Sequence, residues 1–129
     1  MVELIPHDPT EGVYATDGDW IHALEVRGAG RLLFVSGTMG FDPAGVPGAT
    51  LDEQLALIWS NIRTILASAG MTTASIVRVT SYLRDPAYAA ANAAARCAAL
   101  GDRRVPTTAL VAQTLETDWL VEIEVIAAA

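Results

Sequence analysis

The stretch TLDEQLALIWSNIRTILASAG, from Thr50 to Gly70, carries the strongest structural signal in the sequence. Thr50 and Glu53 form the T-x-x-E capping box that commonly begins a helix, and Gly70 is suited to end one. Between them the apolar residues recur at spacings of three and four, which places on one helix face Leu51, Leu55, Ile58, Ile62, Ile65 and Ala69. The sequence therefore predicts an amphipathic helix that turns one face to a core.

Two polar residues interrupt this predicted helix. Gln54 and Asn61 lie seven residues apart, so they share one face of it. The outward face of a globular helix is usually polar. We interpret both side chains as solvated positions.

The remaining elements follow from β-branched runs, turn residues and an alanine-rich tract. In chain order we predict an irregular segment at 1–19, strands at 23–27 and 31–36, a strand at 76–83, a helix from Asp85 to about Leu100, and strands at 108–115 and 120–127. The first two strands flank the turn residues GAG and are expected to form a hairpin. Asp85 and Pro86 are an N-cap and a first-turn proline for the second helix.

This order, β-β-α-β-α-β-β, belongs to the α+β class, and a chain of 129 residues fits a single domain over residues 1–129. Both predicted helices connect strands, so both can cover the same face of one sheet. The other face would stay open. A monomer of this size does not leave a large apolar sheet face in water, and the sequence therefore predicts self-association.

Composition narrows the classes of partner and compartment. The formal net charge of −7 argues against a nucleic-acid partner, which requires a basic face. The single cysteine, Cys97, allows no intrachain disulfide, and the chain shows neither a signal peptide nor an apolar run long enough for a membrane. We expect a cytoplasmic protein. The two histidines lack ligand spacing to cysteines or carboxylates, so no metal site is predicted.

The last predicted strand, LVEIEVIA, places two carboxylates on one face. Side chains alternate along a strand, so Glu122 and Glu124 share a face with Leu120 and Ile126. Either both carboxylates are solvated, or one is buried beside a pocket and serves as an acid, a base or a substrate anchor. The sequence leaves both alternatives open.

The stretch GDRRVPTTALVAQTL, from Gly101 to Leu115, contains two adjacent cations before a proline. Arg103 and Arg104 would favourably complement the dipole at the end of the second helix. An anion-binding loop is an equally good interpretation. Elsewhere, His22 is interpreted as structural, and so is Cys97 in its alanine-rich helix.

Four fragments taken in order, LLFVSGTMGFDPAG, LDEQLALIWSNIRTILASAGM, IVRVTSYLRDPAYAAANAA and VEIEVIA, resemble the Rid/YjgF family of enamine/imine deaminases. The resemblance implies a chorismate-mutase-like fold and a homotrimer whose sheets pack into a central barrel, with active sites in clefts between subunits. It also implies hydrolysis of small 2-aminoacrylate-type enamines or their imines to 2-ketoacids and ammonia. Neither a metal nor an organic cofactor would be required.

The resemblance also implies a set of site residues. Glu122 matches the family glutamate that positions or activates water. The expected substrate-binding residues are Ser36 and Gly37, which match an S-G pair, Asn92 in the second helix, Trp20 in place of a common tyrosine, and His22 near a usual glutamine.

One position departs from the family pattern. Thr108 stands where the P-x-R-[ST] motif has the arginine that grips the substrate carboxylate, while Arg103 and Arg104 both precede Pro106. A threonine hydroxyl does not replace a bidentate guanidinium. We therefore expect Thr108 to shape an altered pocket, with weak or absent activity on the usual 2-iminoacids. The alternative is a non-catalytic small-molecule-binding or chaperone-like trimer. Whether Arg103 or Arg104 reaches into a cleft stays open.

Overall fold

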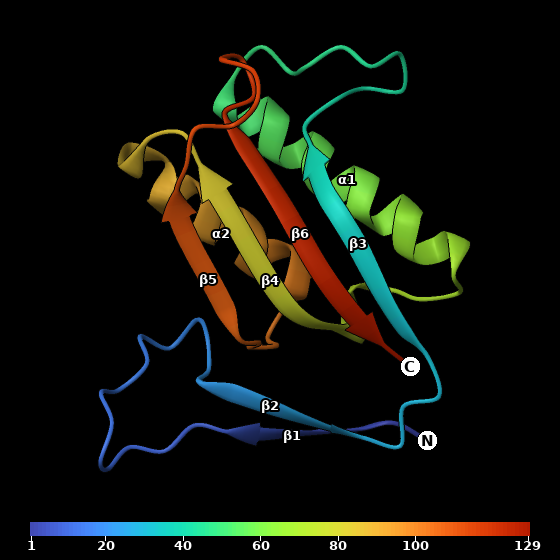
Figure 1. Cartoon of the computed structure of the whole chain (residues 1–129), viewed down its shortest axis with the longest axis vertical. Helices are drawn as coiled ribbons and strands as arrows, with labels where there is room; N and C mark the ends of the chain where they lie inside the picture. The colour runs from blue at the N-terminus through green and yellow to red at the C-terminus, as the bar shows by residue number, and fades with distance from the viewer.

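The computed structural model describes residues 1–129 as two sheets and two main helices (Figure 1). The elements in chain order are β1 (Glu3–His7), β2 (Ala23–Arg27), β3 (Leu32–Met39), α1 (Leu51–Ser68), β4 (Ile76–Leu83), α2 (Ala89–Leu100), β5 (Thr107–Val111) and β6 (Val121–Ala128). Two short 3-10 turns, η1 (Thr73–Ser75) and η2 (Pro86–Tyr88), precede β4 and α2.

The main sheet has the strand order β3-β6-β4-β5. β6 pairs antiparallel with both β3 and β4, and β5 runs parallel to β4 along the far edge. The last strand of the chain therefore lies in the middle of the sheet, while β3 and β5 form its two edges. The smaller sheet, β1 with β2, lies beyond one end of these strands (Figure 1).

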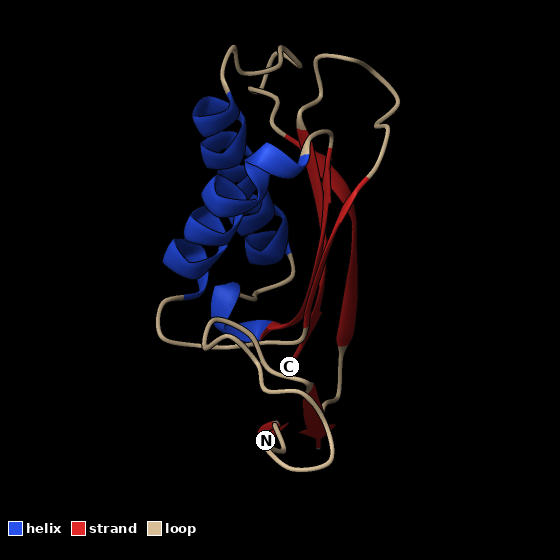
Figure 2. Cartoon of the chain, turned by 90° about the vertical axis from the view of Figure 1, so that its left-hand side faces the viewer, coloured by secondary structure: helices blue, strands red, loops and turns tan.

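Both helices cover the same side of the main sheet, and the other side carries none (Figure 2). β6 shows why: Val121, Ile123 and Val125 are fully buried, whereas Glu122 and Glu124 are only half-buried. This alternation confirms the predicted two faces of the last strand. The α+β class and the placement of both helices on one face are confirmed as well.

The helix α1 begins as the capping box predicts. The Thr50 hydroxyl accepts a hydrogen bond from the backbone N–H of Glu53, and the Glu53 carboxylate accepts one from Ala49. The buried face includes Ile58 and Ile62, as predicted; the exposed Ile65, in contrast, leaves the stripe. No helix of the chain is both long enough and apolar enough to cross a membrane.

Two predictions about the N-terminal part are wrong. The segment 1–19 is not irregular throughout, because β1 forms within it, and the strands at 23–27 and 31–36 do not form a hairpin. β2 pairs with β1, while β3 pairs with β6 across the chain. The GAG turn redirects the chain from one sheet to the other. β3 pairs with the apolar central strand β6 instead of with the neighbouring strand β2.

The prediction of a solvated Gln54 is also wrong. Its side chain is only 2% exposed, and its amide donates to the carbonyls of Gly48 and Asp118 and accepts from the N–H of Leu120. Asn61 is half-buried and donates to the carbonyls of Met39 and Phe41. Both amides fasten loops onto α1, because the segments after β3 and before β6 fold over this face.

The strand β5 is shorter than predicted, ending at Val111 rather than Leu115. The chain beyond it is held by Arg84, whose guanidinium donates to the carbonyl and hydroxyl of Thr114 and to the carbonyl of Glu116. Asp85, predicted as the N-cap of the second helix, caps the 3-10 turn η2 rather than α2 itself.

Candidate functional site

The carboxylate of Glu122 lies directly against Gly37. Glu122 pairs with Met39 across β6 and β3, and β3 contains an irregularity between Val35 and Thr38 that includes the S-G pair. A β-carbon at position 37 would come within 2.6 Å of Glu122 Oε1. A side chain at position 37 would therefore have to displace the Glu122 carboxylate, whereas the backbone of Gly37 is not in the left-handed region. The structure brings together three of the residues expected from the sequence: Ser36, Gly37 and Glu122.

A pocket of about 540 Å³ adjoins Ser36 and Gly37 between β3 and α1, and Glu122 is not among its lining residues. Ser36 and Gly37 line it from the sheet, Phe41 from the following loop, and Asn61 and Ile65 from the helix. The pocket is therefore largely apolar with a few polar groups, which suits a small organic molecule.

The two carboxylates of β6 differ in their surroundings. Glu124 Oε1 accepts a 2.7 Å hydrogen bond from the hydroxyl of Tyr82 on β4. This hydrogen bond, followed by burial, raises the pKa of Tyr82 above its ordinary value of 10.0. Glu122 has no side-chain hydrogen bond or ion pair within the chain. Only Glu122 is therefore free to act on water or a ligand.

Thr108 faces the open side of the sheet. It pairs with Thr80 of β4, and its hydroxyl accepts a 2.7 Å hydrogen bond from Nη2 of Arg78. Sequence reasoning passed over Arg78. The alternation along IVRVTSYL could have found it, because Arg78, Thr80 and Tyr82 share one face.

Arg103 does not approach Thr108. Its guanidinium donates to the carbonyls of Thr73 and Ile76, at 2.8 Å each. Burial lowers the pKa of Arg103 below its ordinary value. Arg103 therefore fastens the turn before β4.

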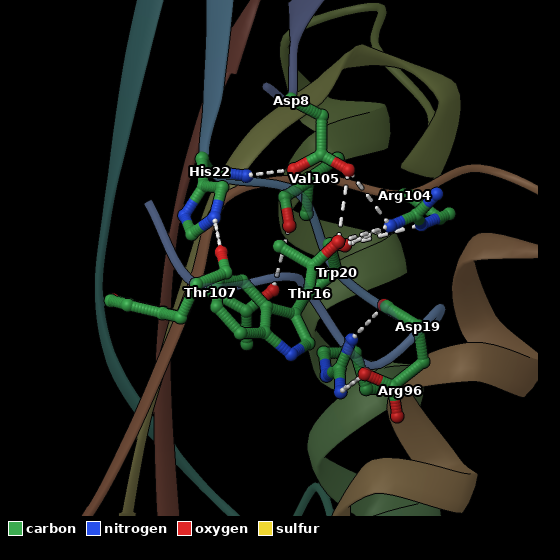
Figure 3. A network of polar contacts seen from close by, with 10 residues as sticks. Asp8, Thr16, Asp19, Trp20, His22, Arg96, Arg104, Val105 and Thr107 are labelled. Atoms are coloured by element: carbon green, nitrogen blue, oxygen red, sulfur yellow. Dashed lines mark hydrogen bonds and ion pairs between the residues drawn. The ribbon is translucent and has the colours of Figure 1, made fainter. Parts of the chain in front are cut away.

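Arg104 holds the N-terminal segment in place (Figure 3). Its guanidinium donates to the backbone carbonyl of Trp20, to the hydroxyl of Thr16 and to the carboxylate of Asp8. The backbone N–H of His22 also donates to Asp8, and this bond is the main cause of a lowered pKa for the Asp8 carboxyl. Neither arginine of the R-R pair takes the place of the missing family arginine within its own chain.

His22 belongs to this same network. Its Nε2 lies 2.7 Å from the carbonyl of Tyr14, and its ring packs edge-on against those of Tyr14 and Trp20. The imidazole thus fixes the segment that carries Trp20.

Trp20 and Asn92 line a second pocket, of about 290 Å³, between the N-terminal segment, α2 and β5. Asn92 is 2% exposed, and its Oδ1 has no hydrogen-bond partner. One turn later, the buried Arg96 donates to the carbonyl of Asp19 and pairs with its carboxylate at 3.4 Å (Figure 3). An unpartnered buried acceptor in a residue that lines this pocket would suit a ligand that carries an N–H or O–H group.

The expected site residues therefore fall into two separate groups. Ser36 and Gly37 lie on the edge strand β3 with Glu122 next to them on β6, whereas Trp20 and Asn92 lie beside β5. Two strand spacings separate β6 from β5 and three separate β3 from β5, roughly 10 and 14 Å at ~4.8 Å each. One chain does not gather all of these residues around a small molecule. No group of three or more His, Cys, Asp or Glu side chains is arranged to hold a metal ion.

Two helices over one face of this mixed sheet, with a glutamate of the central strand set against a glycine of β3, define an α+β protein of the Rid/YjgF type. The chain belongs to the family described as Endoribonuclease L-PSP, whose model matches residues 13–129.

Individual relatives agree with this assignment. A RutC family protein of Pyrococcus horikoshii is 30% identical over 101 residues, which cover 77% of this chain and 80% of that protein. The RutC family protein YjgH of Escherichia coli is 41% identical over 58 residues, but the match spans only 45% of this chain and 44% of YjgH. The crystal structure of YyfB from Yersinia pestis, a protein of the Rid family, superposes with a TM-score of 0.83 at 28% identity, over 98% of both chains.

Proposed function

We propose that this protein is a cytoplasmic homotrimer that hydrolyses a small imine or enamine in clefts between its subunits. The observation that carries the proposal is the unpartnered carboxylate of Glu122, set against Gly37, which itself lines a largely apolar pocket. A half-buried carboxylate without a protein partner is suited to accept a proton from water.

The separation of the site residues supports an assembled site. The β3 and β6 strands of one chain carry Ser36, Gly37 and Glu122, and the β5 side of another would supply Trp20 and Asn92. The open sheet face also exposes large apolar side chains, with Phe34 70% and Leu32 60% exposed. Packing three such faces into a barrel would bury these side chains and join the two edges.

The chemistry needs one general base and no further reagent. An enamine first takes a proton from solvent on its β-carbon and becomes an iminium ion. Glu122 then accepts a proton from water as the water oxygen bonds to the iminium carbon, giving a neutral carbinolamine. Glu122 returns this proton to nitrogen, the C–N bond breaks to release ammonia, and the hydroxyl proton passes to solvent and leaves a ketone. Each step conserves atoms and charge, and Glu122 ends as it began.

Thr108 favours an altered substrate range. The hydroxyl contributes one neutral hydrogen bond where a guanidinium would give a charge-assisted pair. Losing such a contact costs several kcal/mol, roughly a hundredfold in rate. The usual 2-iminoacids are therefore expected to react weakly. The net charge of −7 is unsuited to a ribonuclease, despite the family's description.

The same departure at Thr108 supports the second candidate, a trimer that binds a small molecule without converting it. In the hydrolase Glu122 is needed for the hydrolysis step, whereas in the binder it is only part of the ligand site. Measuring ammonia release distinguishes the two candidates.

The test uses purified protein and a panel of imines, including 2-iminobutyrate generated by an amino-acid oxidase and imines without a carboxylate. Ketone and ammonia are measured for the wild type, Glu122→Gln and the control Glu116→Gln, at an exposed position. We expect turnover of at least one imine that Glu122→Gln abolishes and Glu116→Gln retains. Ligand binding with no ammonia release from any imine would establish the binder instead.

A further inference from the structure

We propose that Arg78 binds an anionic group of the ligand, and that Thr108 is the positioning residue that orients its guanidinium. This inference rests on the proposed site between subunits and names the class of ligand that the site accepts. The juxtaposition that carries it is the 2.7 Å hydrogen bond from Arg78 Nη2 to Thr108 Oγ1 on the open face of the sheet.

The guanidinium of Arg78 has donors to spare. An arginine carries five N–H donors, and the contact with Thr108 is the one side-chain hydrogen bond that Arg78 makes in this chain. No carboxylate pairs with it, although the chain contains 15 acidic residues. A half-buried cation without a counter-ion is costly unless a ligand or a partner completes it.

The other arginines are accounted for. All eight basic residues of the chain are arginines. Arg63 is exposed on α1, and the remaining six donate to backbone carbonyls or pair with carboxylates: Arg27, Arg31, Arg84, Arg96, Arg103 and Arg104. Arg84 and Arg103 are also half-buried without a carboxylate partner, but each donates to two backbone carbonyls. Arg78 alone combines partial burial with a single hydrogen bond, to a hydroxyl.

The surroundings of Arg78 form a concave site. A pocket of about 440 Å³ on the open face is lined by Arg78, Phe34, Thr80, Tyr82, Ile126 and Glu124. The carboxylate of Glu124 in this pocket accepts the hydrogen bond of Tyr82 and forms no ion pair with Arg78. A planar fork of donors beside apolar and hydroxyl groups fits a carboxylate that is attached to a short hydrocarbon chain.

The position of the charge predicts the shape of the ligand. An arginine at position 108 would extend its guanidinium from the edge strand β5, whereas Arg78 projects from β4 and its guanidinium rests against the base of Thr108. The cation thus lies beside the side chain of residue 108, where an arginine at that position would extend beyond it. Along β6, Arg78 pairs with Ile126 and Tyr82 pairs with Glu122, four residues away. This spacing is roughly 13 Å along the strand. Arg78 would therefore bind a ligand that reacts at the Glu122 of a neighbouring subunit.

The site is therefore suited to an imine or enamine whose carboxylate lies several bonds from the reacting carbon. In a 2-iminoacid the carboxylate is attached directly to that carbon. Two ketoacid probes represent the two shapes: 2-oxobutyrate, with adjacent groups, and 4-oxopentanoate, with two methylenes between the ketone and the carboxylate.

The experiment measures binding of both probes by calorimetry to the wild-type protein, Arg78→Met, Arg78→Lys and Thr108→Val. The matched control is Arg63→Met, which removes an exposed arginine of the same size. Size-exclusion chromatography with light scattering follows the oligomeric state of each variant. A turnover assay on the imine panel runs alongside.

We expect 4-oxopentanoate to bind tighter than 2-oxobutyrate, and Arg78→Met to weaken its binding at least tenfold. Arg78→Lys retains part of the affinity as a point charge, Thr108→Val weakens it a few-fold, and Arg63→Met leaves it unchanged. Unchanged binding in Arg78→Met would overturn the inference. So would loss of the wild-type assembly in both Arg78→Met and Arg78→Lys, because Arg78 would then pair subunits rather than a ligand.

The outcomes separate this inference from the proposed function. If Arg78→Met keeps both binding and turnover, the anion site fails while the hydrolase stands. If carboxylate binding depends on Arg78 in a protein that converts no imine, the anion site stands while the hydrolase fails.

Discussion

Gly37 lies so close to Glu122 that a β-carbon at position 37 would come within 2.6 Å of the carboxylate oxygen. The glycine is needed for the space it leaves rather than for its backbone conformation. A single methyl group would therefore move the one carboxylate of β6 that lacks a protein partner.

Gly37→Ala is expected to displace the Glu122 carboxylate and to lower turnover at least tenfold, while the fold is kept. The matched control is Gly30→Ala, because nothing lies within 4 Å of a β-carbon at that position. Steady-state rates and thermal unfolding are measured for both variants. Equal rates for Gly37→Ala and the wild type would show that the position of Glu122 does not limit the reaction.

Exchanging the residues at 78 and 108 should change the preferred ligand. In the double variant Arg78→Thr/Thr108→Arg the guanidinium moves from β4 to the edge strand β5, where the family motif has it. We expect 2-iminobutyrate turnover to rise at least tenfold over the wild type, with 4-oxopentanoate binding weakened. A double variant with the wild-type preference for both compounds would contradict this expectation.

The hydrogen bond between Tyr82 and Glu124 makes stability depend on pH in the alkaline range. Because the pKa of Tyr82 is raised in the folded state, its contribution to stability is fully present below pH 10.0 and is lost as pH rises through the folded-state pKa. Tyrosinate absorbance in Tyr82→Phe against the wild type isolates this titration. In Glu124→Gln the pKa of Tyr82 is expected to fall back toward 10.0; a wild-type titration curve in that variant would refute the assigned cause.

Gln54 holds three backbone groups of two loops through one buried amide. Gln54→Ala leaves these groups without their partner, and we expect the free energy of unfolding to fall by about 1–3 kcal/mol. Urea denaturation measures the loss, with Ser60→Ala, at an exposed position of the same helix, as the control. Equal losses of unfolding free energy in both variants would mean that the hydrogen bonds of the Gln54 side chain do not stabilise the fold.

Arg96 fixes Trp20 indirectly, by holding Asp19 through its carbonyl and its carboxylate. In Arg96→Met the segment 16–22 is expected to loosen, because two contacts to the preceding residue are lost. Hydrogen exchange read by mass spectrometry should be faster in peptides covering this segment, and unchanged there in Arg63→Met. If the segment exchanged as slowly in Arg96→Met as in the wild type, the contacts of Arg104 would be sufficient to hold it.

Local signals in the chain predicted the helix at 51–68 and the two faces of β6, because both follow from side-chain periodicity. The pairing of β2 did not follow, since its partner β1 lies sixteen or more residues earlier and no turn motif joins them. Gln54 was misjudged for a similar reason: its burial depends on loops that are distant in sequence.

The residues of the candidate site likewise include some that local sequence indicates and one that only the fold reveals. The resemblance of short motifs pointed to Glu122, Ser36 and Gly37, and the fold places these three together. Arg78 went unnoticed because an arginine within a strand looks like an ordinary solvated residue. Its contact with Thr108 exists only once β4 and β5 lie side by side.

The sequence by itself thus determined the class of fold, the alternating faces of its strands and the absence of an arginine at position 108, all of which are local properties of the chain. Only the tertiary structure decided where the cations go. A guanidinium donates to whichever acceptors the folded chain brings within reach. Here backbone carbonyls occupy Arg103 and Arg104, while Arg78 donates to the hydroxyl of Thr108 on the open face.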